Sequence, residues 1–353
     1  MSRPLDHSTI DLVPGHELLE RLKELAGTDP ERIALQHKTR GRWVAWRWRA
    51  VVTEVDRIAG GLRHLGLTTG SALVVSGEIG PHLLLVAAAA RVIGAKVLSA
   101  PRAAGPDLLR AILTGGHVSV VFTQGRTALA AWLKAWPESA ERRRIVFDHV
   151  TADGHSPHPD VITYAHLRVL AGPVGWADAV SGPRNPVGAG ELLWVEETTD
   201  WHDGLDHVTA AWIAQRPTLV FPEIIAAATR DRRQVRPSRW LASARGLAAA
   251  ARDIESRFPH RTGLSGRLVA AIVDRGQQDR FARLGAALLR SRLGLNRLDR
   301  IDIVGPREAA SLDGGTGRLF RGLGVRLEPT SGHPIATLCN PAVQTFEMAG
   351  GVR

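Results

Sequence analysis

The sequence predicts an α/β protein with two subdomains, each a mostly parallel sheet with flanking helices. Three observations predict this fold. Between residues 72 and 147 short apolar segments alternate with segments of helical spacing, joined by short links that contain glycine. From residue 218 the same alternation resumes with less regular spacing. Residues 151–190 are rich in Pro, Gly, His and Asp and separate the two regions. We therefore expect subdomains at residues 10–190 and 191–345.

The chain before the alternating region begins with a helix and a hairpin. Pro14–Ala26 carries leucines at helical spacing behind an N-terminal proline. Two predicted strands, Arg32–His37 and Trp43–Trp48, flank Gly41, which favours a turn between them. Apolar residues at helical spacing predict a second helix over Ala50–Leu65.

The later elements are predicted from apolar runs and helical spacing in the same way. Predicted strands cover residues 72–76, 96–99, 118–122, 144–147, 218–221, 238–241, 301–304 and 325–327. Predicted helices cover residues 81–93, 106–113, 127–136, 164–170, 268–293 and 308–323.

The functional prediction depends on residues 192–205, Leu-Leu-Trp-Val-Glu-Glu-Thr-Thr-Asp-Trp-His-Asp-Gly-Leu. A short apolar strand runs into a loop, which is where many α/β proteins hold a phosphate with free backbone N–H groups. Phosphate loops are rich in glycine and usually carry a lysine. This loop instead carries Glu196, Glu197, Asp200 and Asp203, with Gly204 as its one glycine. Four carboxylates would repel a polyphosphate at contact distance, so the loop has the position of a nucleotide loop and the opposite charge.

Composition excludes several classes of protein. Hydrophobic residues make up 44% and charged residues 23% of the 353 residues, which is typical of a globular protein with a hydrophobic core. The longest apolar run, Leu83–Ala90, is too short to span a bilayer. The N-terminus has no apolar segment of the signal-peptide type, so we expect a cytoplasmic protein. The single cysteine, Cys339, excludes an internal disulfide framework and a cysteine zinc site.

The chain is basic, with a formal net charge of +10 from 45 Lys and Arg against 35 Asp and Glu. Such a balance can attract nucleic acid or an anionic membrane surface. Here the arginines are scattered rather than clustered, which favours a solvated basic surface over a nucleic-acid partner.

Several stretches in one collinear order carry a resemblance to a known family. They cover residues 41–48, 52–75, 83–100, 144–148, 219–223, 235–237, 292–298 and 319–325. In these stretches the chain resembles the AMP-forming acyl-CoA synthetases of the adenylate-forming superfamily, nearest to the long-chain fatty-acid CoA ligases. The resemblance implies the α/β fold of that family's N-terminal region. In the family, this region takes part in ATP-dependent ligation of an acid to CoA.

The family's phosphate loop, Thr-Ser-Gly-Thr-Thr-Gly-x-Pro-Lys-Gly, falls on residues 195–204. Three positions match and are expected to be vestigial cofactor contacts: Thr198, Thr199 and Gly204. Glu197 and Asp200 stand where the motif has glycines, and Asp203 stands where it has the lysine. The glycines let the backbone curl around a phosphate and the lysine supplies a cation, so these replacements oppose phosphate binding.

The family's adenine motif, Tyr-Gly-x-Thr-Glu, falls on residues 331–335, where only Gly332 matches. Ser331 replaces the adenine-stacking Tyr, and Ile335 replaces the Mg-binding Glu. Isoleucine offers no oxygen ligand to a hard cation. Arg245 remains where the family has a ligand contact, and we count it with Gly332 as a vestigial cofactor-binding residue.

Two further departures concern length. Between His207 and Thr218 the chain is expected to be too short for the helix and strand that follow the family's phosphate loop. The sequence also stops at Arg353, soon after the adenine motif, so the resemblance implies that the family's C-terminal lid domain is absent.

Other chemistry is weighed against simpler alternatives. The best histidine groupings are His155 with His158, and His202 with Asp206 and His207. A structural zinc site needs four ligands in a closed shell, so a solvated helix start is favoured over a metal at the second grouping. The ten tryptophans are expected to fill the core rather than to form a platform for stacking bases. No residue is assigned a catalytic or metal-binding role.

We therefore expect a degenerate acyl-CoA synthetase-like protein that acts by binding an acyl ligand or a protein partner. ATP and Mg²⁺ are expected only if residual family activity persists. One alternative is a divergent ligase that forms acyl adenylates from ATP and is completed by another chain. The other alternative is a basic module that binds nucleic acid or a membrane surface.

Overall fold

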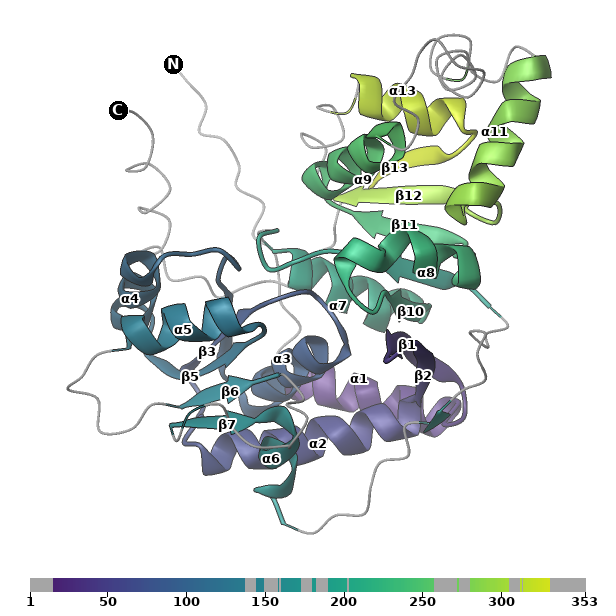
Figure 1. The fold of residues 1–353 in the computed structure, drawn as a ribbon. Helices are drawn as coiled ribbons and strands as arrows, with labels where there is room; N and C mark the ends of the chain where they lie inside the picture. Colours follow the sequence, from purple (N-terminus) through teal and green to yellow (C-terminus); the bar gives the residue numbers. More distant parts are fainter. Residues whose placement is uncertain are drawn as a thin grey trace, which may run out of the picture.

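The computed structural model describes residues 15–136, 144–148, 160–172, 190–201, 203–256, 280–304 and 314–330, together with residues 158, 180–181, 272 and 312. These residues form two β-sheets with helices packed on both faces of each (Figure 1). The α/β class predicted from the sequence is confirmed.

The smaller sheet has the strand order β4-β3-β5-β6-β7, and all its neighbours are parallel. These strands are β3 (Ala72–Ser76), β4 (Lys96–Ser99), β5 (Val118–Thr123), β6 (Ile145–Phe147) and β7 (Val161–Thr163). Helices α4 (Pro106–Gly115) and α5 (Arg126–Ala135) pack on its outer face through a core that includes Leu109 and Trp132.

The larger sheet has the strand order β13-β12-β11-β9-β10-β1-β2-β8. It is parallel from β13 to β1, and β2 and β8 extend it in antiparallel pairing. Its strands are β1 (Ile33–Thr39), β2 (Arg42–Arg47), β8 (Val180–Ser181), β9 (Leu192–Val195), β10 (Thr218–Phe221), β11 (Arg239–Ala242), β12 (Arg300–Val304) and β13 (Arg326–Thr330). Its outer face packs on α8 (Ala228–Val235), α9 (Ala244–Ser256), α11 (Arg280–Leu293) and α13 (Gly315–Gly322).

One continuous core joins the inner faces of the two sheets. Val75 and Phe122 of the smaller sheet belong to the same cluster of buried side chains as Leu193 and Phe221 of the larger sheet. The helices in this layer are α1 (Gly15–Thr28), α2 (Trp48–His64), α3 (Pro81–Ile93), α6 (Tyr164–Val169) and α7 (Gly204–Gln215). The nine tryptophans among the described residues are all buried, as the sequence predicted.

Most predicted elements form within two residues of their expected bounds. The predicted hairpin closes with Arg40 at φ 48° and Gly41 at φ 74°, and two left-handed residues in a row suit the twist of the flanking strands. The helices predicted at residues 268–293 and 308–323 are described only in part, as α11 and α13.

The larger sheet contains strands from both sides of residue 190, because β1 pairs with β10 and carries β2 into it. One expectation about length is corrected. The interval from His207 to Thr218 is not too short, since α7 occupies it and leads directly into β10.

Candidate functional site

The acidic loop lies at the carboxyl-terminal edge of the larger sheet. β9 is buried on both faces between β11 and β10, and its four residues Leu-Leu-Trp-Val are all apolar. The chain leaves β9 at Glu196 and enters α7 at Gly204. Because α/β sheets bind ligands beyond the carboxyl ends of their strands, the loop is in the position of a binding loop.

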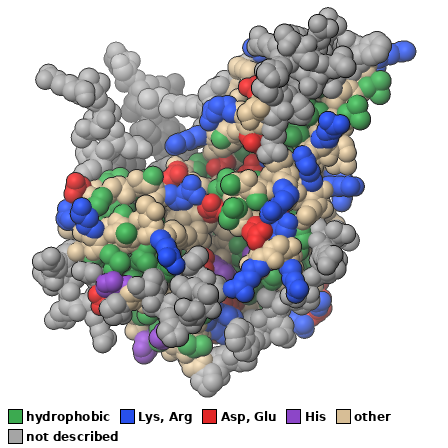
Figure 2. Space-filling view, in the orientation of Figure 1, with side chains coloured by type: hydrophobic (Ala, Val, Ile, Leu, Met, Phe, Trp, Pro, Cys, Tyr) green, Lys and Arg blue, Asp and Glu red, His purple; other side chains and the backbone are tan. Residues whose placement is uncertain are grey.

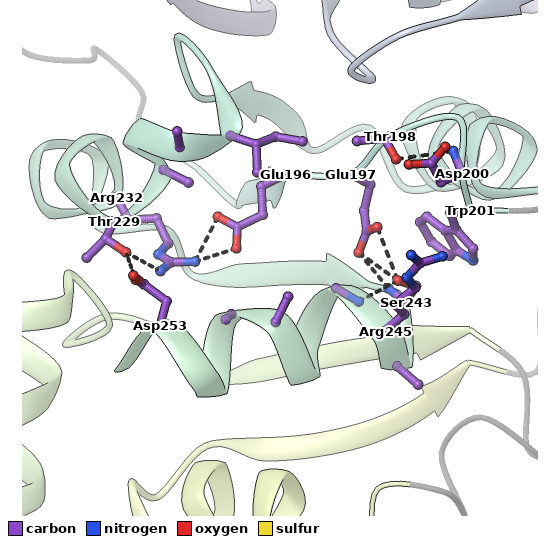
Figure 3. Close-up of a pocket in the computed structure, with 17 residues that line it drawn as sticks. Glu196, Glu197, Thr198, Asp200, Trp201, Thr229, Arg232, Ser243, Arg245 and Asp253 are labelled. Atoms are coloured by element: carbon purple, nitrogen blue, oxygen red, sulfur yellow. Dashed lines mark hydrogen bonds and ion pairs between the residues drawn. The ribbon is translucent and has the colours of Figure 1, made fainter. Parts of the chain in front are cut away.

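A pocket of about 660 Å³ opens beside this loop, within the range of small-molecule sites. Its walls are the loop, the segment from the 3₁₀ turn Ile225–Ala227 into α8, and the first turns of α9 (Figure 3). The polar and aromatic residues that line it are Glu196, Glu197, Thr198, Asp200, Trp201, Thr229, Arg232, Ser243, Arg245 and Asp253.

Glu197 points its carboxylate at the start of α9. One carboxylate oxygen accepts a hydrogen bond from the backbone N–H of Ser243 at 2.8 Å, and the Ser243 hydroxyl lies 3.1 Å from both oxygens. A Cβ atom on Gly246 would lie 2.2 Å from the same carboxylate, so the glycine leaves room for it. A helix N-terminus stabilises an anion, and here a buried side chain of the protein supplies that anion.

Glu196 is engaged on the other side of the pocket. Its two carboxylate oxygens each accept a hydrogen bond from the Arg232 guanidinium at 2.8 Å, and Trp194 Nε1 donates to one of them at 2.7 Å. Arg232 is 1% exposed and lies 4.3 Å from the Trp240 ring centroid. Burial raises the pKa of Glu196 above its ordinary value, and this effect outweighs the opposite one of Arg232.

The pocket is acidic overall. Four carboxylates line it, from Glu196, Glu197, Asp200 and Asp253, against the guanidiniums of Arg232 and Arg245, which leaves a formal charge of −2. Arg245 is exposed, and its side chain makes no hydrogen bond to the described residues. Figure 2 shows Asp and Glu side chains in the middle of one face of the molecule, with Lys and Arg around them.

The structure brings together only part of the predicted cofactor-binding set. Thr198 and Arg245 both line the pocket. Thr199 is buried and joins the two sheets: its hydroxyl donates to the Ala100 carbonyl at 2.7 Å and accepts from the Gly77 N–H at 3.0 Å. These contacts give Thr199 a structural role that does not need a ligand.

Gly204 begins α7 and does not line the pocket. A Cβ atom there would lie 2.4 Å from the ring of Trp201, so close packing accounts for the glycine. Gly332 lies outside the described residues, as do His155 and His202 of the histidine groupings.

The two glutamates of the loop are not available to hold the Mg²⁺ of Mg-ATP. Mg²⁺ needs oxygen ligands in octahedral geometry, while Glu196 and Glu197 are committed to Arg232 and Ser243. Nor do the described residues contain a group of three His, Cys, Asp or Glu side chains placed to hold a metal ion.

Sequence reasoning missed the partners of the loop carboxylates. Arg232, on α8, lies 36 positions after Glu196, and Ser243, at the end of β11, lies 46 positions after Glu197. It also missed a second cavity lined by His37, His82 and Asp148. The only local signal was that Asp148 directly follows a predicted strand, where polar side chains of α/β sites gather.

Comparison with known proteins agrees with the fold. Residues 22–171 match the family model described as AMP-binding enzyme. No curated protein matches the chain in sequence. No helix in the described part of the chain is long and apolar enough to cross a membrane.

Solved structures resemble the chain over most of its length. Acetoacetyl-CoA synthetase from Streptomyces lividans superposes with a TM-score of 0.57 at 14% identity, covering 89% of this chain and 51% of that one. A luciferase-like enzyme from the mealworm Zophobas morio superposes with a TM-score of 0.54 at 11% identity, covering 94% and 74%. An acyl-CoA synthetase from Brucella canis superposes with a TM-score of 0.55 at 14% identity, covering 88% and 56%. The chain therefore spans about half the length of two of these proteins.

At such low identity these superpositions establish the fold and not the activity. The chain thus carries an AMP-binding family match over residues 22–171 and has the fold of the acyl-CoA synthetases.

Proposed function

We propose that this chain is a degenerate acyl-CoA synthetase-like protein, a pseudoenzyme that acts by binding an acyl ligand or a protein partner. The observation that carries the proposal is the carboxylate of Glu197 at the N-terminus of α9, hydrogen-bonded to Ser243. The protein's own carboxylate therefore occupies a helix start at which an external anion could otherwise bind.

Electrostatics support the same conclusion. At 4 Å and an effective dielectric constant of about 20, two unit charges of the same sign repel by about 4 kcal/mol. A polyphosphate in this pocket would face four carboxylates, and one of the two arginines, Arg232, is already paired with Glu196. Arg245 alone would remain to hold the ligand.

The pocket itself supports a binding function for the chain. The pocket has a volume of about 660 Å³ and apolar walls that include Ile225, Ala249 and Ala250. Catalysis of the family kind depends on groups positioned around a transition state, and the phosphate-loop replacements remove several of them. Binding a ligand in the same cavity does not require groups positioned around a transition state.

The test is an assay of ATP–pyrophosphate exchange with a panel of carboxylic acids, beside a calorimetric titration with long-chain acyl-CoA. We expect no exchange above the protein-free background. Acyl-CoA binding would identify an acyl ligand, whereas its absence would favour a protein partner, to be identified by affinity capture and reconstituted from purified components. Exchange activity of the purified chain would overturn the proposal and favour the divergent ligase.

A further inference from the structure

Helix α11 presents a row of apolar side chains to solvent. Leu284 and Leu288 are 66% and 65% exposed, the two highest values among the large hydrophobic residues that the structure describes. They lie one turn apart on the same side of the helix, and the exposed residues Ala287 and Ser291 continue the row at the spacing i, i+3, i+4, i+7. We call these four residues the outer row. A row of this spacing is the contact pattern of one helix on another.

The outer row is not needed to hold α11 on the protein. Ala286, Leu289 and Leu293, on the other side of the helix, are buried in the core on the outer face of the larger sheet. One apolar stripe is enough to pack a surface helix on a globular protein, so the outer row is a second apolar face. Figure 1 shows α11 at the edge of the molecule, with α8 beside it.

Positive charges surround the outer row. All charged residues of α11 are arginines. Arg280 lies one turn before Leu284, and Arg292 lies one turn after Leu288. These two arginines and Arg283 are exposed, and their side chains make no ion pair with a carboxylate of the described residues.

The neighbouring helix α8 widens this basic surface. Arg233 Nε donates a hydrogen bond to the backbone carbonyl of Arg292 and so joins the two helices. Arg233 and Arg236 are exposed, while the one acidic residue of α8, Asp231, is buried and paired with Lys38. Figure 2 shows Lys and Arg side chains along the part of the face where Figure 1 places α8 and α11.

The charges decide which helix could cover the outer row. A second copy of the chain that paired through α11 would bring arginines against arginines, because this helix has no acidic residue to oppose them. Like charges at the flanks of a helix pair are destabilising, and opposite charges there set the choice of partner. The complementary surface is therefore a helix with acidic flanks.

The size of the side chains favours a helix over a lipid surface. Helices that lie in a membrane interface carry large residues such as Trp, Phe and Leu along the apolar face. In the outer row, Ala287 and Ser291 are small and alternate with the two leucines. Small residues leave room for the side chains of a packed helix, because the distance between helix axes depends on the residues at the contact.

We propose that α11 binds an amphipathic helix of a partner protein, with apolar residues on its contact side and Asp and Glu on its flanks. The apolar residues pack on the outer row, and the carboxylates pair with Arg280, Arg283 and Arg292. The inference rests on the protein-partner form of the proposed function and names the chemistry of that partner. No residue of α11 lines the acidic pocket.

The probe for this surface is a synthetic peptide of about three heptads, with leucine at positions a and d and glutamate at e and g. A staple on its outer side keeps it helical, so that binding does not depend on folding of the peptide. A matched peptide carries lysine at e and g. In fluorescence anisotropy with the full chain, we expect the glutamate peptide to bind with a Kd below about 100 µM. The lysine peptide should bind at least about tenfold more weakly.

Substitutions on the surface of α11 locate the contact. Leu284→Gln and Leu288→Gln change exposed side chains, and each should weaken binding of the glutamate peptide by about tenfold. Val169→Gln, at an apolar residue of α6 that is 64% exposed, is the matched control and should leave binding unaltered. Arg283→Glu should weaken the glutamate peptide by about threefold or more and strengthen the lysine peptide.

The wild-type protein gives a reading that does not depend on the variants. The methyl resonances of Leu284 and Leu288 should shift in NMR spectra on addition of the glutamate peptide, and those of Val169 should not.

The proposal is overturned if the glutamate peptide does not bind, if the lysine peptide binds as tightly, or if both Gln variants bind like the wild type. Binding to phosphatidylglycerol vesicles through Leu284 and Leu288, without binding to the peptide, would also overturn it in favour of a lipid surface. ATP exchange tests the acidic pocket and the peptide titration tests α11, so the two proposals fail separately.

Discussion

At the scale of single residues, Glu197 links the acidic loop to the start of α9. A glycine at this position would leave the start of α9 open, whereas the carboxylate accepts hydrogen bonds from the N–H and hydroxyl of Ser243. The sequence showed that an acidic residue stands where the family motif has a glycine. It could not show that this carboxylate binds Ser243, because Ser243 lies 46 positions further along the chain.

Gly204 gives a prediction in which a motif residue is explained by packing. A Cβ atom at Gly204 would lie 2.4 Å from the Trp201 ring, whereas Gly27 in α1 has nothing within 4 Å of its Cβ position. Gly204→Ala should lower the free energy of unfolding by about 1–3 kcal/mol through overpacking. Gly27→Ala, the matched control, should leave it equal or raise it by up to about 1 kcal/mol. Urea denaturation measures both, and equal stability of the two variants would refute the packing explanation.

His37 gives a prediction for the dependence of stability on pH. Its pKa is about 3 in the folded chain against an ordinary value of 6.5, so between these values the unfolded chain binds the extra proton. The folded state therefore loses stability at this residue as the pH falls from 6.5 toward 3. His82, with its raised pKa, contributes stability that is present below its ordinary pKa and lost as the pH rises through its folded value. Asp148, with its lowered pKa, contributes stability that is present above its ordinary pKa and lost as the pH falls through its folded value.

Replacing His37 isolates its contribution from those of the two neighbours. Between pH 7 and pH 5, His37→Gln should lose about 1–2 kcal/mol less stability than the wild type. The measurement is urea denaturation at the two pH values, with His64→Gln as the control for loss of one histidine. A His37→Gln variant with the wild-type pH dependence would show that His37 does not titrate as its burial indicates.

At the scale of elements, the two sheets are joined through the acidic loop. The loop residue Thr199 contacts the backbone of Gly77, after β3, and of Ala100, after β4, while Thr198 forms an isolated bridge with Glu78. Loss of the Thr199 hydroxyl would leave the buried Gly77 N–H without that acceptor.

Thr199→Val keeps the shape of the side chain and should destabilise the fold by about 1–3 kcal/mol. Thr198→Val removes a hydroxyl that accepts a hydrogen bond from the Asp200 N–H in the exposed part of the loop. It should lower the free energy of unfolding by less than Thr199→Val does. Thermal unfolding of the two variants provides the comparison. If Thr199→Val is as stable as the wild type, the hydroxyl does not join the sheets, and a ligand role for Thr199 becomes the better explanation.

Helices and strands whose ends are marked by local residues could be predicted from the sequence. The neighbours of a strand in a sheet could not, because they are set by pairing between distant segments. β3, α3 and β4 have the bounds read from the sequence, because Pro81 and Gly94 mark the ends of α3 and the strands are continuous apolar runs. The place of β1 in the larger sheet was missed because it depends on pairing with β10, which lies about 180 positions away. Alternation along the chain carries no information about such a partner.

At the scale of the whole molecule, the chain has the fold of the acyl-CoA synthetases, and the loop that follows β9 is acidic. A shared fold permits many functions, so the activity has to be argued from the site. The pocket at the end of β9 has four carboxylates against two guanidiniums, and this imbalance is the feature from which the function is argued. We therefore propose that this pocket excludes nucleotide.

Whether the acidic pocket excludes nucleotide is measured by calorimetric titration of the purified chain with Mg-ATP. We expect no heat of binding up to about 1 mM ATP. Micromolar binding that Arg245→Ala abolishes would contradict it, because Arg245 is the exposed cation of the pocket and its truncation should not disturb the fold.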